Sequence, residues 1–205
     1  MFPLKRPSKL ALTVATSLWL AGARASAQVT TEPAAAIFPD PSKFARGLYT
    51  EGEVGAVAFF GRAGDAVAPG FAIGARVGYD LTRFLAVQLH ALGSTHETKG
   101  DGPAAGQLLQ TYQGMAEGKA TLRFGQTSLF AEGGIGLTRF STNLLYTLGV
   151  EPHFRTGLTL GGGGGFDYHS LSRHFSVGVR AWFNTLRDLN ASRDLVATTY
   201  LRYTF

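Results

Sequence analysis

Eight stretches of about ten residues between Gly47 and Phe205 alternate between apolar and polar side chains, and clusters of Gly, Asp, Asn, Pro or Ser separate them. Because successive side chains of a strand point to opposite faces, this alternation predicts strands with one apolar face. The expected strands cover residues 47–60, 70–80, 84–96, 112–124, 128–140, 155–168, 174–184 and 195–205. No apolar stretch after residue 27 approaches the ~20 residues of a membrane-spanning helix. The chain is therefore predicted to be all-β.

The connections between these strands alternate in length. Those after the second, fourth and sixth strands are short, at residues 81–83, 125–127 and 169–173, and the others are longer. Short turns at one end, longer loops at the other and an even number of strands are typical of outer-membrane barrels. Residues 47–205 are therefore predicted to form an eight-stranded antiparallel up-and-down transmembrane β-barrel, with its longer loops facing away from the cell.

The two faces of each expected strand differ in chemistry. In 116–124, small and apolar residues alternate with Glu117, Lys119, Thr121 and Arg123. A soluble barrel would place its apolar face inside, around a ligand, and periodicity alone does not separate the two cases. Only 16% of the residues are charged, whereas a surface in water typically carries about 25–35%. An apolar face toward lipid is favoured, and a soluble periplasmic barrel that binds an apolar ligand is the alternative.

The polar face would then line the lumen of the barrel. An eight-stranded barrel is just wide enough for side chains to fill, so charges there need partners. The sequence therefore predicts a lumen plugged by charge pairs and, as an alternative, a narrow OmpW-like channel for small or hydrophobic solutes. The predicted charge network comprises Glu51, Glu53, Arg76, Asp80, Glu117, Lys119, Arg123, Glu132, Asp167, Arg180 and Arg202, and Gln88 and His90 share its face.

The amino-terminal segment has the features of a secretory signal peptide. Lys5, Arg6 and Lys9 precede an apolar run over 10–21, and Ala25-Ser26-Ala27 follows as a cleavage site. Residues 1–27 are assigned to the signal peptide and the Pro-containing residues 28–46 to a periplasmic arm. Cleavage near Ala27 leaves 15 basic and 14 acidic residues, a net charge of +1. No nucleic-acid partner is expected, because the remaining cations are scattered.

Two motifs suggest chemistry, and neither is complete. Gly161–Gly165 lacks the Lys-Ser or Lys-Thr of a phosphate loop, and is interpreted as room for aromatic neighbours or for curvature. His174, Ser176 and Asp188 resemble the His, Ser and acid arrangement of lipid A deacylases, but about ten residues of strand, roughly 30 Å, would separate the acid from the base. No enzyme activity, no cofactor and no metal site is predicted, the last because the chain has no cysteine and its histidines show no paired ligand spacing.

The last predicted strand places Leu201, Tyr203 and Phe205 on one face. This pattern resembles the carboxyl-terminal signature of outer-membrane β-barrels, and residues 47–205 resemble the small OmpA, OmpX, OmpW and Opa barrels. The resemblance implies that the barrel-assembly machinery reads these three residues as an assembly signal and that outer-membrane lipid surrounds the barrel. We expect an integral protein of the outer membrane of a Gram-negative-type bacterium with a structural or surface-interaction role, whose surface ligand is not indicated by any motif.

Overall fold

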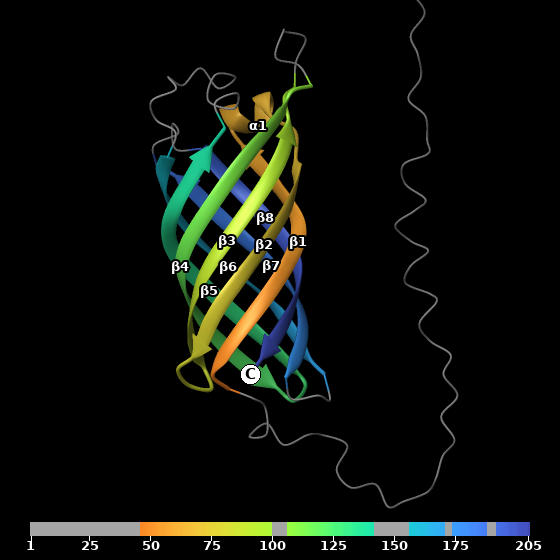
Figure 1. Ribbon diagram of the computed structural model, residues 1–205, viewed down its shortest axis with the longest axis vertical. Coiled ribbons are helices and arrows are strands. Elements are labelled where there is room, and N and C mark those ends of the chain that lie inside the picture. The colour runs from red at the N-terminus through yellow and green to blue at the C-terminus, as the bar shows by residue number, and fades with distance from the viewer. Residues whose placement is uncertain (1–45, 100–105, 142–155, 171–173, 188–191) are drawn as a thin grey trace, which may run out of the picture. The chain divides into compact units, whose positions relative to one another are not determined.

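The computed structural model describes residues 46–99, 106–141, 156–170, 174–187 and 192–205. Eight strands form one closed sheet in chain order (Figure 1). They are β1 (Leu48–Phe60), β2 (Gly70–Asp80), β3 (Leu85–Glu97), β4 (Leu108–Phe124), β5 (Thr127–Phe140), β6 (Thr156–His169), β7 (Phe175–Leu186) and β8 (Ser192–Thr204). Every neighbouring pair is antiparallel, and β1 closes the barrel on β8, with Glu51 opposite Arg202. The predicted eight-stranded antiparallel up-and-down barrel is confirmed.

The strand boundaries follow the sequence pattern closely, with two larger differences. β4 begins at Leu108 rather than at 112, and β8 begins at Ser192 rather than at 195. Between β4 and β5, the hairpin has a loop of two residues, and Gly125 adopts a φ of +62° at its first position. Hairpin turns of this length need that left-handed backbone, which favours glycine. The predicted signal peptide and residues 28–45 of the predicted arm lie outside the described residues.

One helix lies in a segment that was expected to be an irregular loop. Helix α1 (Arg62–Ala66) follows β1 at the end of the barrel that carries the longer connections, which we name the loop end (Figure 1). Ala63 and Val67 are four residues apart and therefore share one face, and both are buried against the interior of the barrel. A helix of five residues is too short to produce a periodic pattern, so the sequence did not reveal it.

The outward face of the barrel is largely apolar between its two rims. Large side chains such as Ile73 and Leu89 are exposed, at 59% and 66%. Aromatic residues gather toward the opposite, short-turn end, where they include Tyr79, Phe84, Phe124, Tyr168, Phe175 and Phe205. An apolar band bordered by aromatic side chains suits hydrocarbon and its interface rather than water. Among the described residues, no helix is long and apolar enough to cross a membrane.

Candidate functional site in the barrel lumen

Arg180 on β7 holds the centre of a buried charge cluster. Its guanidinium nitrogens donate to Glu51 Oε2 at 2.9 Å, to Glu53 Oε2 at 3.1 Å and to Glu132. The first two carboxylates come from β1 and the third from β5, so the Arg180 side chain connects β7 to both of these strands across the lumen. All four side chains are at most 1% exposed. Such a pairing compensates charges that would otherwise be costly to bury.

Arg76 and His90 extend the cluster toward β4. Arg76 donates to Glu53, and its Nε lies 3.1 Å from Glu117 Oε2. The two ring nitrogens of His90 lie 2.7 Å from Glu53 Oε1 and 2.8 Å from Glu117 Oε1. Glu53 thus contacts Arg76, His90 and Arg180 at once, which makes it the most highly shared carboxylate of the cluster.

A second group of contacts joins the cluster to the short-turn end. Tyr49 donates its hydroxyl to Gln88 Oε1 at 2.7 Å, and Gln88 Nε2 donates to the carboxylates of Glu117 and Glu132, both at 2.6 Å. The guanidinium of Arg202 stacks on the Tyr49 ring at 3.6 Å. Hydrogen bonds through Gln88 and Tyr49, and the stacking of Arg202 on the Tyr49 ring, therefore connect the cluster around Arg180 to residues nearer the short-turn end.

The charged residues nearer the short-turn end also have partners. Arg202 Nη2 lies 2.5 Å from Asp80 Oδ2. Lys119 Nζ lies 3.5 Å from Asp167 Oδ2 and 3.8 Å from the centre of the Phe130 ring, where a cation–π contact forms. Tyr200 donates its hydroxyl to Asp167. We name the charged and polar residues of all these contacts the central network. They are Tyr49, Glu51, Glu53, Arg76, Asp80, Gln88, His90, Glu117, Lys119, Glu132, Asp167, Arg180, Tyr200 and Arg202.

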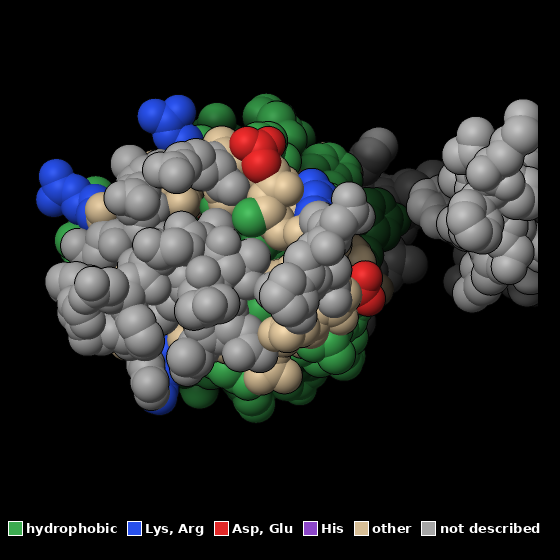
Figure 2. All heavy atoms as spheres, turned by 90° about the horizontal axis from the view of Figure 1, so that it is seen from above, with side chains coloured by type: hydrophobic (Ala, Val, Ile, Leu, Met, Phe, Trp, Pro, Cys, Tyr) green, Lys and Arg blue, Asp and Glu red, His purple; other side chains and the backbone are tan. Residues whose placement is uncertain are grey.

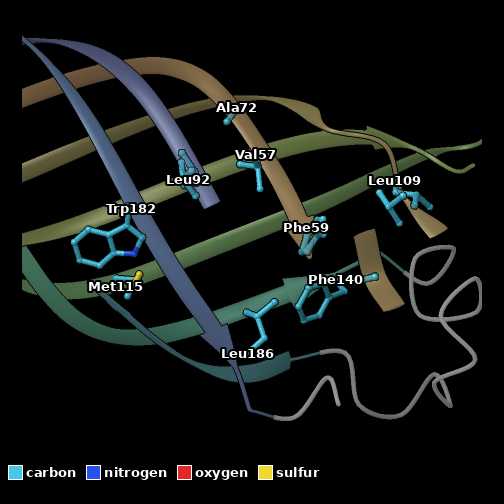
Figure 3. Close-up of a cluster of buried hydrophobic side chains, with 12 residues drawn as sticks. Val57, Phe59, Ala72, Leu92, Leu109, Met115, Phe140, Trp182 and Leu186 are labelled. Atoms are coloured by element: carbon cyan, nitrogen blue, oxygen red, sulfur yellow. The ribbon is translucent and has the colours of Figure 1, made fainter. Parts of the chain in front are cut away.

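The loop-end half of the lumen holds a cluster of apolar side chains, which was not predicted (Figure 3), and buried polar residues such as Ser94, Asn184 and Asp194 lie in the same half. We name this cluster the apolar plug, and it consists of Val57, Phe59, Ala63, Val67, Ala72, Leu92, Leu109, Met115, Phe140, Trp182, Leu186 and Val196. Its largest member, Trp182, is 1% exposed and donates its ring N–H to Asn184 Oδ1 at 2.5 Å. The expectation that apolar side chains face outward is therefore wrong at these positions, and on β1 the reason is that residues 57–60 are apolar on both faces.

The glycine run on β6 makes room for these aromatic side chains. Gly161, Gly163 and Gly165 share the inward face, and a Cβ atom at Gly161 would collide with the indole nitrogen of Trp182. At Gly165 it would collide with the ring of Phe130. The interpretation of this run as space for aromatic neighbours thus agrees with the structure.

Two small cavities lie inside the described part of the barrel. A cavity beside the apolar plug, lined by Gln113, Asn184 and Asp194 among others, has a volume of about 10 Å³. Another at the short-turn mouth, lined by Arg123 and His169 among others, is of the same size. Each has room for about one water molecule. Neither cavity therefore has space for a solute larger than water.

The residues of the predicted charge network lie at inward positions of their strands. Of its members, Asp80 and Arg123 are half-buried near the short-turn mouth, and the others are buried. Further inward residues that share the same alternation were not predicted, and they include Tyr49, Ser94, His96, Thr111, Gln113, Ser128, Thr138, Thr159, His169, Trp182, Asn184, Asp194, Thr198 and Tyr200. Their position in the alternation was a sufficient signal for most of them. Asp194 was missed because β8 was predicted to begin at 195.

The residues that resemble a catalytic arrangement are not brought together. Ser176 is buried in the lumen, whereas His174 is exposed, donates from Nδ1 to the carbonyl oxygen of Thr204 at 2.5 Å and stacks on Tyr203. No hydrogen bond joins His174 to Ser176 within the described residues, and Asp188 lies outside them. The described residues also contain no group of three His, Asp or Glu side chains placed to hold a metal ion.

The predicted assembly signal lies on the outward face at the short-turn end. Leu201 and Phe205 are exposed. Tyr203 packs edge-on against Phe205 at 5.0 Å between ring centres and against Phe175 at 4.9 Å. The three side chains therefore form one aromatic and apolar patch that is accessible from outside the barrel.

Residues 15–198 match the family described as outer membrane protein beta-barrel domain. Among solved structures, Neisserial surface protein A is 14% identical with a TM-score of 0.58, covering 78% of this chain and 99% of that chain. The outer membrane protein OprG from Pseudomonas aeruginosa is 13% identical with a TM-score of 0.50, covering 80% and 98%. The outer membrane enzyme PagL is 16% identical with a TM-score of 0.46, covering 77% and 99%. No curated protein sequence matches. The first two likenesses show a shared fold.

Proposed function

This chain belongs to the outer-membrane β-barrel family and thus to the Gram-negative outer membrane, and we propose that it is a sealed barrel with a structural or surface-interaction role there. The observation that carries the proposal is the filling of the lumen. The central network occupies the middle and the short-turn end, and the apolar plug with the buried polar residues beside it occupies the loop-end half. A solute would have to displace both at once.

The two fillings oppose conduction for different physical reasons. Moving Arg180 aside would leave three buried carboxylates without it, at a cost of several kcal/mol. Opening the apolar plug would expose the side chains of Phe59 and Trp182 to water, at a cost of about 25 cal/mol per Å² of apolar surface. The separation of His174 from Ser176 gives no support to a hydrolytic role.

The first experiment tests insertion and sealing in sequence. Cells that express the chain are fractionated, and the gel mobility of the protein is compared with and without boiling in detergent. We expect an outer-membrane protein with a heat-modifiable band. A protein that stays in the soluble periplasmic fraction without that shift would contradict the proposal and favour an apolar-ligand-binding barrel.

Sealing is then tested by bilayer conductance of the purified protein. We expect no stepwise conductance from the wild type, nor from Glu97→Gln, which removes a charge from the exterior. A unit conductance in the wild type that changes in Arg180→Gln but not in Glu97→Gln would establish the narrow channel instead, because only the first substitution alters the lumen.

Export and assembly are part of the proposal. We expect cleavage between Ala27 and Gln28, which amino-terminal sequencing of the mature protein would check. The patch of Leu201, Tyr203 and Phe205 is accessible from the lipid side, as a recognition element for the assembly machinery needs to be. Phe205→Ser should lower the amount of heat-modifiable barrel in the outer membrane, whereas the same substitution at Phe124, an exposed aromatic residue at the same end, should lower it less.

A further inference from the structure

Charged side chains on the outward face of the strands occur only at the loop-end rim. Within the described strands, the outward positions carry Glu97, Arg139 and Arg193 as their charged residues, and each is the outermost residue of that face on its strand. Arg187, directly after β7, continues the same outward alternation and is exposed. Figure 2 views this end from above and shows Lys and Arg side chains projecting beyond the apolar wall.

The three arginines lie on β5, directly after β7 and on β8, and β6 separates the first from the other two. Arg193 on β8 pairs with Thr185, two residues before Arg187. The Arg187 N–H donates to Leu158 O on β6, and Leu158 pairs with Leu137, two residues before Arg139 on β5. With strands ~4.8 Å apart and alternate residues ~6.8 Å apart, Cα separations are roughly 8 Å for Arg187–Arg193 and 12 Å for Arg139–Arg187. By the same spacing, Arg139 and Arg193 lie roughly 20 Å apart. Each neighbouring pair of arginines can therefore contact one anionic group, and the three together can contact a head group that carries more than one.

Among the residues that the structure describes, these arginines have no acidic partner. Within the described residues, none of the three guanidinium groups has an ion pair or a hydrogen bond, whereas Lys99 near the same rim donates from Nζ to Gly64 O at 2.7 Å. Directly below them, the outward residues are apolar, and they include Leu137, Leu158, Leu160, Phe183 and Leu195. An uncompensated cationic cluster directly above an apolar band lies where the head groups of the outer leaflet meet its hydrocarbon.

We propose that Arg139, Arg187 and Arg193 form a binding site for the phosphate groups of a phosphorylated lipid of the outer leaflet. Guanidinium groups bind phosphate through paired N–H donors, and the apolar band beneath them receives the acyl chains. The partner is a lipid rather than a free anion, because a lipid contacts both the arginines and the apolar band beneath them. This site rests on the proposed insertion into the outer membrane.

The test uses the folded full-length mature protein in neutral detergent micelles, with bisphosphorylated lipid A as the probe and its dephosphorylated form beside it. Native mass spectrometry gives the fraction of barrels that carry a lipid as its concentration rises. Each cation near an anionic lipid surface contributes roughly fivefold in affinity, so Arg139→Gln/Arg187→Gln/Arg193→Gln should weaken the apparent Kd about 100-fold. The dephosphorylated lipid should bind the wild type and the triple variant alike.

Arg46→Gln/Arg83→Gln is the matched control, since it removes exposed arginines at the short-turn end. It should leave the Kd within about twofold, and equal weakening in the control and the triple variant would overturn the site. Displacement of the lipid by an equal concentration of inorganic phosphate would show that the cluster takes the free ion and would also overturn it. The heat-modifiable band is read in every sample, so a failure to form the membrane barrel is distinguished from a failure to bind.

Discussion

Substituting Arg180 by methionine removes the guanidinium that three carboxylates share and keeps a side chain of similar length. Glu51 and Glu53 retain contacts with Lys119 or Arg76, whereas Glu132 has no second cation within ion-pair distance in the described residues. Removing one partner of a buried pair typically costs about 3–5 kcal/mol. We expect Arg180→Met to lower the free energy of unfolding by about 4 kcal/mol, because at least one carboxylate is left buried without its cation.

The measurement is reversible unfolding by guanidinium chloride in detergent micelles, followed by fluorescence and by the heat-modifiable band. Arg46→Met is the control, because Arg46 is exposed, and it should change the unfolding free energy by less than about 0.5 kcal/mol. Adding Glu132→Gln to Arg180→Met removes the orphaned charge. The double variant should therefore be more stable than the sum of the single effects by about 0.5–3 kcal/mol.

A loss in Arg180→Met no larger than that in Arg46→Met would refute the reasoning. It would mean that water screens the carboxylates around position 180, and thus that the lumen is hydrated and the sealed barrel is wrong. If the changes in unfolding free energy of the two single variants simply add in the double variant, Arg180 and Glu132 do not interact, which would contradict their direct contact in the structure.

Three further predictions concern the apolar plug and the turns. Gly163→Ala should reduce the yield of folded barrel, because its Cβ would collide with Ala181 O. Gly162→Ala is the control and should leave the yield unchanged, because its Cβ would lie 3.4 Å from Glu132 O. The heat-modifiable gel band measures the yield of both variants. After signal cleavage Trp182 is the only tryptophan, so emission should be blue-shifted and resist acrylamide quenching, and a solvent-like spectrum would contradict the plug. Gly125→Val should slow refolding and lower stability by about 1–2 kcal/mol, measured by urea unfolding, because a β-branched residue disfavours a φ of +62°.

The alternation of side chains predicted the barrel and its inward charges well, because a closed sheet leaves each strand residue only two faces. Glu117, Lys119 and Arg180 could be assigned to the lumen without knowledge of any contact. The sequence could not say which of them meet. Arg180 and Glu53 are 127 residues apart, and their contact depends on how far every strand is staggered around the barrel.

The apolar plug escaped prediction because alternation loses its information where both faces are apolar. On β1, residues 54–60 read Val-Gly-Ala-Val-Ala-Phe-Phe, and nothing in that run marks Val57 and Phe59 as inward. Only the register with neighbouring strands decides it. A charged residue that faces the lumen can thus be recognised from the sequence. An apolar residue that faces the lumen can be recognised only when a charged residue on the same strand, such as Glu53, shows which alternate positions point inward.

The apolar plug lies between the loop end and the central network, and this order makes the stability of the network depend on the plug. The apolar plug closes the loop end over the central network, so it keeps water from reaching Glu53 and Arg180 from that side. Where water is excluded, the attraction between opposite charges is stronger, and so is the cost of separating them. Shortening Trp182 would therefore weaken the ion pairs below it as well as the plug. Conduction through this barrel would require the plug to open first, and opening it would loosen the network that holds the opposite walls together.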